Sequence, residues 1–289
     1  MNIGALYRLT KPGVTYGNLI TTIAGYLFAA NGMIDWVVFA ALTIGTWAVI
    51  ASACVINNYL DQDIDAIMTR TKKRPLLTGE VTPFQARVFG TILGITGTLL
   101  LSIFTNLWVA GIGVIGWFVY VWLYGVLGKR KSVHGTLVGA VSGAVPIWAG
   151  WLAVYPGFDI IGLLLFLVIF FWQMPEFYAI SIFRKDEYAK AGVPVSAVIR
   201  GVPATVRQIF VYSFLTITSA LLLVMSPLTS WVTFVVFSLV SLRWLSIVWA
   251  GLCADEPVIW AKKEFHFALI FLVVFCIIIS VNPYLPSFN

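Results

Sequence analysis

Residues 36–56 read WVVFAALTIGTWAVIASACVI, an apolar run without a charged side chain. A hydrocarbon core of about 30 Å requires roughly 20 such residues for one helical crossing. The run therefore predicts a transmembrane helix, and eight similar runs predict eight more. The nine predicted spans are 14–34, 36–56, 84–104, 107–127, 133–153, 159–180, 208–226, 229–249 and 265–282.

The composition of the 289-residue chain is that of a membrane protein. Hydrophobic residues make up 60% of the chain and charged residues 10%, whereas soluble domains carry roughly 25% charged residues. So few charges cannot cover a soluble globule, which excludes an ordinary soluble enzyme, a disordered chain and a nucleic-acid binder. Three widely spaced cysteines exclude a disulfide scaffold. We expect one all-α membrane domain over residues 1–289, in contact with membrane lipid.

The distribution of Lys and Arg predicts the orientation of the chain. With a cytoplasmic N-terminus, every basic residue except Arg243 lies in or beside a cytoplasmic connection, while the opposite connections carry only Asp35 and Asp159 as charges. Because cytoplasmic loops collect Lys and Arg, the sequence predicts an N-in, C-out topology. The cytoplasmic connections are 1–13, 57–83, 128–132, 181–207 and 250–264. Two of them are long, so we expect the chemistry on this side.

The second span continues into Asn57-Asn58-Tyr59-Leu60-Asp61-Gln62-Asp63-Ile64-Asp65, called here the first acidic segment. Asn57, Asp61 and Asp65 are four residues apart, so at about 100° per residue they share one helix face, and Asp63 points away. Their oxygens suit Mg²⁺, which shares its shell with substrate phosphates. Basic residues suited to phosphate follow: Arg70, Lys72, Lys73 and Arg74. The alternative is a solvated helix end whose acids balance these bases.

The sixth span ends at another group of charges. Glu176 follows Pro175 inside the span; an ionisable residue there indicates a functional site, and the proline predicts a kink. The second acidic segment, residues 184–190, reads Arg184-Lys185-Asp186-Glu187-Tyr188-Ala189-Lys190. This segment either belongs to a functional site or is an ordinary amphipathic loop.

The connection between the fourth and fifth spans adds Lys129, Arg130, Lys131 and His134. The next helix carries Gly135, Gly139 and Gly143 at a four-residue spacing, which favours close helix packing. His134 and His266 are the two histidines, and both lie near the predicted cytoplasmic edge. An interfacial histidine is more often a structural hydrogen bonder than a ligand, so a cofactor role is the lesser alternative for both.

Several of these segments together resemble the UbiA superfamily of intramembrane prenyltransferases. They are the first acidic segment, Arg70-Thr71-Lys72-Lys73-Arg74-Pro75-Leu76, Trp172-Gln173-Met174-Pro175, and Phe183-Arg184 with Tyr188 and Ala191-Gly192-Val193-Pro194. The resemblance extends from Thr10-Lys11-Pro12-Gly13 to Trp260-Ala261-Lys262-Lys263. The Trp-Gln-Met-Pro segment and the basic connection that ends in Gly135-Thr136 are similar to the branch that acts on heme.

The resemblance implies a nine-helix bundle around a cavity that opens to the cytoplasmic side of a bacterial inner membrane. It implies transfer of the farnesyl group of farnesyl diphosphate to the 2-vinyl group of heme b, with addition of water and release of diphosphate. Asn57, Asp61, Asp65 and Asp186 would be the catalytic residues and hold Mg²⁺. The diphosphate would contact Arg70, Lys73, Arg74, Lys129, Arg184 and Lys190, and the heme His134, Glu176 and Tyr188. Heme A synthase or a terminal oxidase is an implied partner.

Two positions depart from the family pattern. Relatives often carry His where this chain has Glu176, and the second acidic segment keeps only the Asp186 end of an aspartate pair. The first departure leaves another UbiA-type transfer as an alternative, onto a quinone precursor or another aromatic acceptor. A secondary transporter for an anionic solute is the alternative from a different class. Spans interrupted by Gly and Pro fit a transporter, but the sequence has no clear internal repeat.

Overall fold

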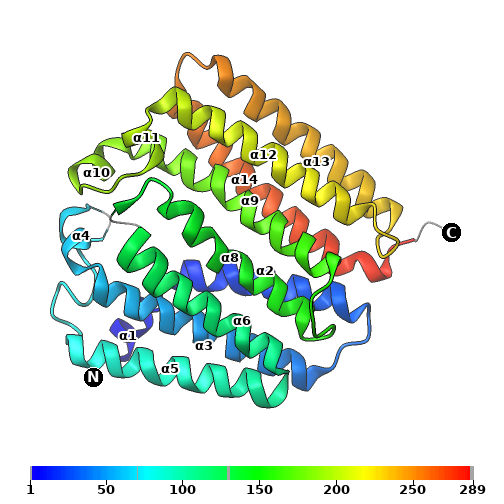
Figure 1. Cartoon of the computed structure of the whole chain (residues 1–289), viewed down its shortest axis with the longest axis horizontal. Helices are drawn as coiled ribbons and strands as arrows, with labels where there is room; N and C mark the ends of the chain where they lie inside the picture. Colours follow the sequence, from blue (N-terminus) through cyan, green and yellow to red (C-terminus); the bar gives the residue numbers. More distant parts are fainter. Residues whose placement is uncertain (1, 70, 129–130, 287–289) are drawn as a thin grey trace.

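The computed structural model describes residues 2–69, 71–128 and 131–286, and its regular elements are helices (Figure 1). In chain order they are α1 (Ile3–Leu9), α2 (Pro12–Ala30), α3 (Trp36–Leu60), α4 (Gln62–Ile67), α5 (Pro83–Phe104), α6 (Leu107–Phe118), η1 (Val119–Gly128), α8 (Gly135–Leu152), α9 (Ile160–Phe183), α10 (Lys185–Lys190), α11 (Ser196–Ile199), α12 (Val202–Val224), α13 (Trp231–Ala250), η2 (Gly251–Cys253), α14 (Pro257–Val281) and η3 (Asn282–Tyr284). The long helices run side by side, and the termini lie at opposite ends of the bundle.

Each predicted span corresponds to a helix, and the fourth consists of α6 continued by the π-helical segment η1. Among the described residues, 8 helices are long and apolar enough to cross a membrane. The first predicted span, α2, is not one of them because polar residues lower its hydropathy. Two of these, Thr21 and Thr22, bond through their hydroxyls to the carbonyl oxygen of Asn18 at 2.7 and 3.1 Å. Nine spans and the N-in, C-out topology therefore stay predictions.

The two acids of the opposite connections begin helices. The carboxylate of Asp35 accepts hydrogen bonds from the N–H groups of Val37 and Val38 at 2.9 and 3.1 Å. Asp159 accepts one from Gly162 at 2.8 Å. An acid at this position satisfies N–H groups that have no partner within the helix. Helix capping therefore accounts for both charges.

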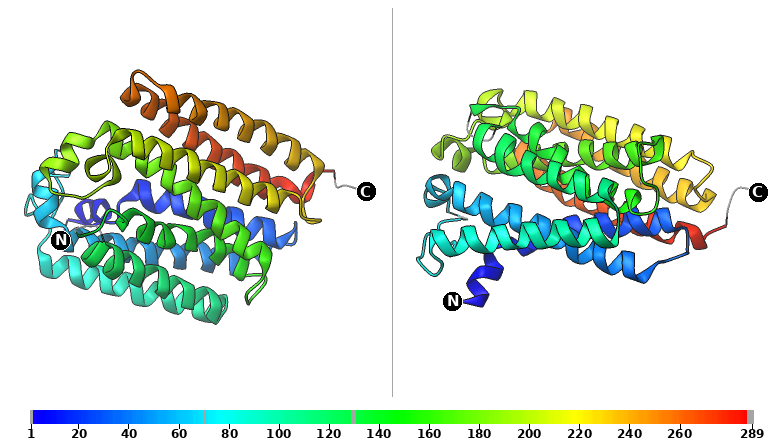
Figure 2. Two further views of the ribbon diagram at one scale, coloured as in Figure 1. Left: turned by 45° about the horizontal axis from the view of Figure 1, so that its top comes forward. Right: turned by 60° about the horizontal axis from the view of Figure 1, so that its bottom comes forward.

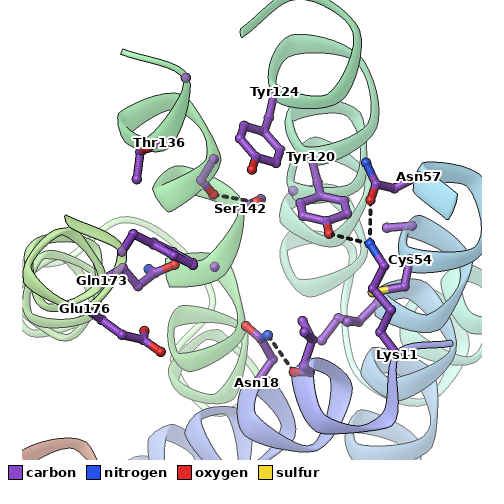
Figure 3. A pocket seen from close by; sticks show the side chains of 18 of the residues that line it. Lys11, Asn18, Cys54, Asn57, Tyr120, Tyr124, Thr136, Ser142, Gln173 and Glu176 are labelled. Carbon is purple, nitrogen blue, oxygen red and sulfur yellow. Dashed lines mark hydrogen bonds between the residues drawn. The ribbon is translucent and has the colours of Figure 1, made fainter. Parts of the chain in front are cut away.

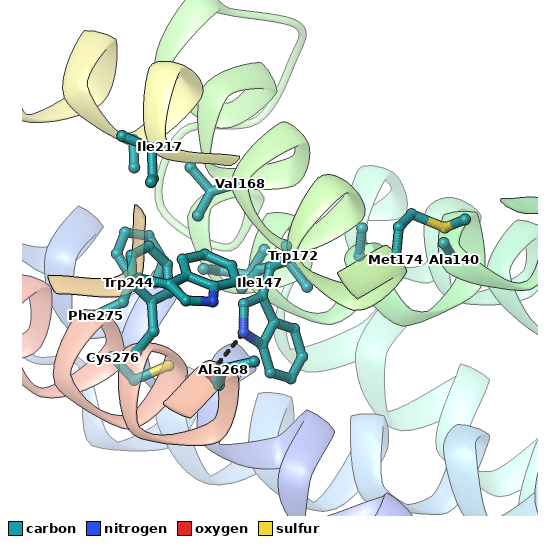
Figure 4. Close-up of a cluster of buried hydrophobic side chains, with 14 of the residues drawn as sticks. Ala140, Ile147, Val168, Trp172, Met174, Ile217, Trp244, Ala268, Phe275 and Cys276 are labelled. Carbon is teal, nitrogen blue, oxygen red and sulfur yellow. Dashed lines mark hydrogen bonds between the residues drawn. The ribbon is translucent and has the colours of Figure 1, made fainter. Parts of the chain in front are cut away.

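The interior is held by aromatic packing and by close backbone contacts. In the core between α9 and α14, Nε1 of Trp172 donates to the carbonyl oxygen of Ala268 at 2.7 Å (Figure 4). Glycines bring α2 against α8, since a Cβ atom on Gly150 would lie 2.2 Å from the carbonyl oxygen of Thr22. Small residues that allow such contacts are typical of membrane bundles.

The short helices gather at one end of the bundle, called here the loop end. α4, α10 and α11 follow α3 and α9 there, and α1 stands at an angle to the long helices (Figure 2). Arg8 of α1 pairs with Glu80, and this hydrogen bond lowers the pKa of the Glu80 carboxyl. The connections 57–83 and 181–207 are thus partly helical. α9 continues through Pro175 to Phe183, so the proline does not end the helix.

Candidate active site

A cavity of about 760 Å³ lies inside the bundle, between α2, α3, α5, α6, η1, α8, α9 and α14. Ligand cavities typically measure roughly 300–1,000 Å³, so this volume suits an organic ligand of moderate size. Its polar end, at the loop end of the bundle, is lined by Lys11, Asn57, Asp65, Arg74, Arg184 and Tyr188. Its apolar end is lined by Val49, Leu101, Val109, Gly113, Val145 and Ala149.

The aligned polar residues of the first acidic segment are buried at the polar end, where Asn57 and Asp65 line the cavity and Asp61 lies behind this lining. Asn57, Asp61 and Asp65 are 2%, 0% and 2% exposed. α3 ends before Asp61, yet the N–H of Asp61 donates to Asn57 O at 3.0 Å and that of Asp65 to Asp61 O at 2.9 Å. The three residues therefore lie on consecutive turns, as the spacing predicts. Asp63 is exposed.

Lys11 is the residue of the polar end that the sequence reasoning missed. Its Nζ donates to Oδ1 of Asn57 at 2.5 Å and to the hydroxyl of Tyr120 at 3.5 Å (Figure 3). The backbone of Lys11 is left-handed, with φ 51°, a conformation that costs about 1–3 kcal/mol for a residue with a β-carbon and that clusters at functional sites. The Thr10-Lys11-Pro12-Gly13 motif was the available signal.

Arg74 is the basic residue that reaches the first acidic segment. Its guanidinium pairs with Asp65, and the Oγ1 of Thr71 donates to Asp65 O at 2.9 Å, which holds the turn in place. Lys73 is exposed and does not line the cavity. Arg70 and Lys129, two other predicted diphosphate contacts, lie outside the described residues.

The second acidic segment contributes only in part. Arg184 and Tyr188 line the polar end, and Arg184 pairs with Glu187 at 3.1 Å. Asp186 and Lys190 are exposed, and neither lines the large cavity. Asp186 is thus placed on the surface, and its assignment as a magnesium ligand stays a prediction.

The wall opposite Asn57 is formed by α9 and α8. The carboxylate of Glu176 points into the cavity (Figure 3), while Nε2 of Gln173 donates to the carbonyl oxygens of Ala140 and Ile169 at 3.2 and 3.0 Å. A Cβ atom on Gly143 would lie 2.0 Å from Oε1 of Gln173. The predicted small residues thus serve close packing and also keep the cavity open.

The two histidines lie in different surroundings. Nε2 of His134 lies 3.2 Å from Nη2 of Arg200, and the ring does not line the cavity. His266 does line it, together with Lys262 of the same helix, and its Nδ1 is 2.5 Å from the carbonyl oxygen of Lys262. Of the two, His266 is therefore the one placed to meet a ligand.

The donors of the first acidic segment fit magnesium. Mg²⁺ is usually bound through one or two carboxylates and completes its shell with waters and substrate phosphates, and Asp61, Asp65 and the Asn57 amide offer this set. Nδ2 of Asn57 is buried and has no hydrogen-bond partner among the described residues, so it is free to donate to a ligand oxygen. Among the described residues, no three His, Cys, Asp or Glu side chains form a metal cluster. A magnesium ion whose coordination shell is completed by substrate oxygens and water does not require three such protein ligands.

The chain is therefore a helical membrane protein whose bundle encloses a cavity with acids and bases at one end. The chain belongs to the UbiA prenyltransferase family, whose model matches residues 18–273. This match confirms the resemblance seen in the sequence.

The most informative relatives share one name. The chain is 40% identical over 280 residues to protoheme IX farnesyltransferase of Photorhabdus laumondii, and the match covers 97% of this chain and 95% of that protein. It is 41% identical over 287 residues to protoheme IX farnesyltransferase of Yersinia enterocolitica, with 99% and 97% covered.

Solved structures show the same fold. A digeranylgeranylglyceryl phosphate synthase structure superposes with a TM-score of 0.83 at 20% identity and covers 97% of this chain and 98% of that one. A UbiA homolog from Archaeoglobus fulgidus bound to GPP and Mg²⁺ gives a TM-score of 0.66 at 14% identity, with 96% and 100% covered. At these identities the likeness concerns the fold alone.

Proposed function

We propose that this chain transfers the farnesyl group of farnesyl diphosphate to the 2-vinyl group of heme b, adds water and releases diphosphate, so that heme O forms. The observation that carries the proposal is the two-ended cavity, which offers charged groups to a diphosphate and an apolar wall to an isoprenoid. Relatives named protoheme IX farnesyltransferase match nearly the whole chain, which favours heme over a quinone precursor as the acceptor.

At the polar end, the protein binds the diphosphate and stabilises it as it leaves. Lys11, Arg74 and Arg184 supply positive charge, and Nδ2 of Asn57 is placed to donate to a phosphate oxygen. Bound Mg²⁺, held by Asp61 and Asp65 with Asn57, supplies charge neutralisation of the diphosphate. Groups fixed in place before the reaction stabilise developing charge without having to reorganise. We assign no direct contact to Asp186 and Lys190 in this proposal, because both are exposed and neither lines the cavity.

The transfer itself forms one carbon–carbon bond. The C1–O bond of farnesyl diphosphate breaks and its electron pair leaves with the diphosphate, while the terminal vinyl carbon bonds to C1. Water then adds to the cation beside the porphyrin ring and loses a proton. We assign that proton to Glu176, whose carboxylate faces the cavity. The rings of Trp117, Tyr120 and Tyr124 also line it, and ring faces attract a passing cation.

The polar end faces the cytoplasm in this proposal, in a bacterial inner membrane with the N-terminus inside. Two observations support it. The connections that carry the described basic residues lie at the loop end (Figure 1), and cytoplasmic connections collect Lys and Arg. The termini lie at opposite ends of the bundle (Figure 1), as an odd number of spans requires. Heme A synthase or a terminal oxidase would receive the product.

The test is to incubate the purified, detergent-solubilised protein with heme b, farnesyl diphosphate and Mg²⁺, with and without EDTA, and to analyse the extracted hemes by mass spectrometry. We expect a hydroxyethylfarnesyl heme that forms only without EDTA. Release of diphosphate without a modified heme would overturn the choice of acceptor and favour a quinone precursor. No release by folded protein would overturn prenyl transfer and favour the transporter.

A further inference from the structure

The depth of the cavity can be measured along α3. Asn57 lines the polar end, and Thr46 of the same helix lines the cavity eleven residues earlier. At about 1.5 Å per residue the two levels are roughly 16 Å apart. The cavity is thus deep and is apolar where it is furthest from the diphosphate groups.

This depth matches a prenyl chain of three isoprene units. An extended chain advances about 1.2 Å per bond, so the main chain of a farnesyl group spans roughly 13 Å. A fourth unit adds about 5 Å at the same rise per bond and would exceed the distance from Asn57 to Thr46. The bottom of the cavity is therefore where donors of different length are distinguished.

Gly113 of α6 is the residue at that bottom whose side chain would change the depth. A Cβ atom there would meet only Cδ1 of Leu101, at 3.6 Å, which is an ordinary van der Waals contact. A larger side chain would then extend into the space beside Leu101 and Val109, which line the same end. Gly116, one turn further, has less room, because its Cβ atom would lie 3.3 Å from Val145.

We propose that Gly113 is a specificity-determining residue that sets the longest prenyl chain the cavity accepts. The inference rests on the proposed function, since it concerns the donor of that reaction. The missing side chain leaves room for the third isoprene unit, and Leu101 and Val109 close the cavity beyond it. A side chain at position 113 would occupy the space of the terminal unit, so the cavity would then suit a geranyl chain.

The fold supplies a matched control for this position. Gly111 lies on the same helix, is exposed, does not line the cavity and has nothing within 4 Å of an added Cβ atom. Leucine is a better helix former than glycine at both positions. Gly113→Leu and Gly111→Leu therefore make the same chemical change, and only the first changes the cavity.

The experiment offers equal amounts of geranyl and farnesyl diphosphate to each variant together with heme b and Mg²⁺. The ratio of geranyl to farnesyl heme is read by mass spectrometry. We expect Gly113→Leu to shift the ratio at least about tenfold toward geranyl, since one methylene changes discrimination about 10–200-fold. Gly111→Leu should keep the wild-type ratio. If Gly113→Leu does not fold, Gly113→Ala should shift the ratio in the same direction by a smaller factor.

Two results would overturn the inference: an unchanged ratio in folded Gly113 variants, or an equal shift in Gly111→Leu. Failure of the proposed function has another signature, because wild-type protein would then prenylate heme with neither donor. In that event, direct competition between the two diphosphates for binding tests Gly113 separately. If Gly113→Leu leaves the ratio of the affinities for geranyl and farnesyl diphosphate unchanged, the role of Gly113 is overturned.

Discussion

The first acidic segment lies within the bundle, whereas the second lies largely on its surface. Asp61 and Asp65 are 0% and 2% exposed, and the latter pairs with Arg74. Asp186 and Lys190 are exposed on α10, a helix without a buried residue. Both segments follow an apolar span and mix acids with bases. The difference teaches that the position of each acid on the turns after the span decides whether it is buried.

The two spans end in a similar way, and the acids differ in their position on the turns that follow. Beyond α3, backbone hydrogen bonds continue through Asp61 to Asp65, so side chains four residues apart keep facing the interior. Beyond α9 the same bonds continue, since the N–H of Arg184 donates to Ile180 O at 3.0 Å and that of Tyr188 to Arg184 O at 3.1 Å. Arg184 and Tyr188 line the cavity, whereas Asp186 lies between them in the sequence and is exposed. The acids of α10 then face water, where charge pairs contribute little.

The largest effect is expected for a buried acid of the first segment. Asp61→Asn should lower kcat for prenyl transfer by about 10²-fold or more, because the lost charge acts on the leaving diphosphate. Asp63→Asn is the control, since Asp63 is exposed on the same segment. Steady-state kinetics of heme prenylation measure both. Equal losses in the two variants would contradict the assignment of the buried face.

Variants of Glu176 test whether a carboxylate outside both acidic segments takes part in the transfer reaction. Glu176→Gln should slow the reaction by about 10²-fold, the lower end of what a general base contributes, and Glu176→His should retain most of the activity because imidazole also accepts protons. The measurement is the rate of hydroxyethylfarnesyl heme formation. Full activity of folded Glu176→Gln would remove the residue from the mechanism.

A smaller effect is expected for Arg74, the arginine that pairs with the first acidic segment. Arg74→Lys should raise the KM for farnesyl diphosphate about tenfold, because lysine cannot make the paired contacts of a guanidinium. Lys72→Gln serves as the control, since Lys72 is exposed near Arg74. Initial rates at varied farnesyl diphosphate give KM and kcat. A KM that stays at the wild-type value would place the diphosphate elsewhere.

The smallest effect is expected in the second segment. Asp186→Asn should change kcat/KM by less than about threefold, as is usual for an exposed charge. A loss comparable to that of Asp61→Asn would show that α10 moves onto the metal site when substrate binds. The comparison needs both variants in one assay at the same Mg²⁺ concentration.

Much of this architecture could be predicted from the sequence. Apolar runs locate the helices, since the length of a span is fixed by the bilayer, and the spacing of Asn57, Asp61 and Asp65 predicts their shared face. Lys11 could not be placed on Asn57 by the same reasoning, because the contact joins residues 46 positions apart. Tyr120 and Tyr124 of η1 also line the cavity, and the sequence could not single them out because an apolar span offers many aromatic residues and only the packing of the helices decides which of them face a cavity.

The most direct test of the central claim measures binding without turnover. A farnesyl thiolodiphosphate, whose carbon–sulfur bond resists cleavage, is titrated into wild-type, Asp61→Asn and Asp63→Asn proteins by calorimetry, with Mg²⁺ or with EDTA. Binding should require Mg²⁺, should be retained in Asp63→Asn, and should weaken in Asp61→Asn at least about tenfold, which corresponds to about 1.4 kcal/mol. Equally tight binding in EDTA, or by Asp61→Asn, would contradict a magnesium–diphosphate site at the first acidic segment.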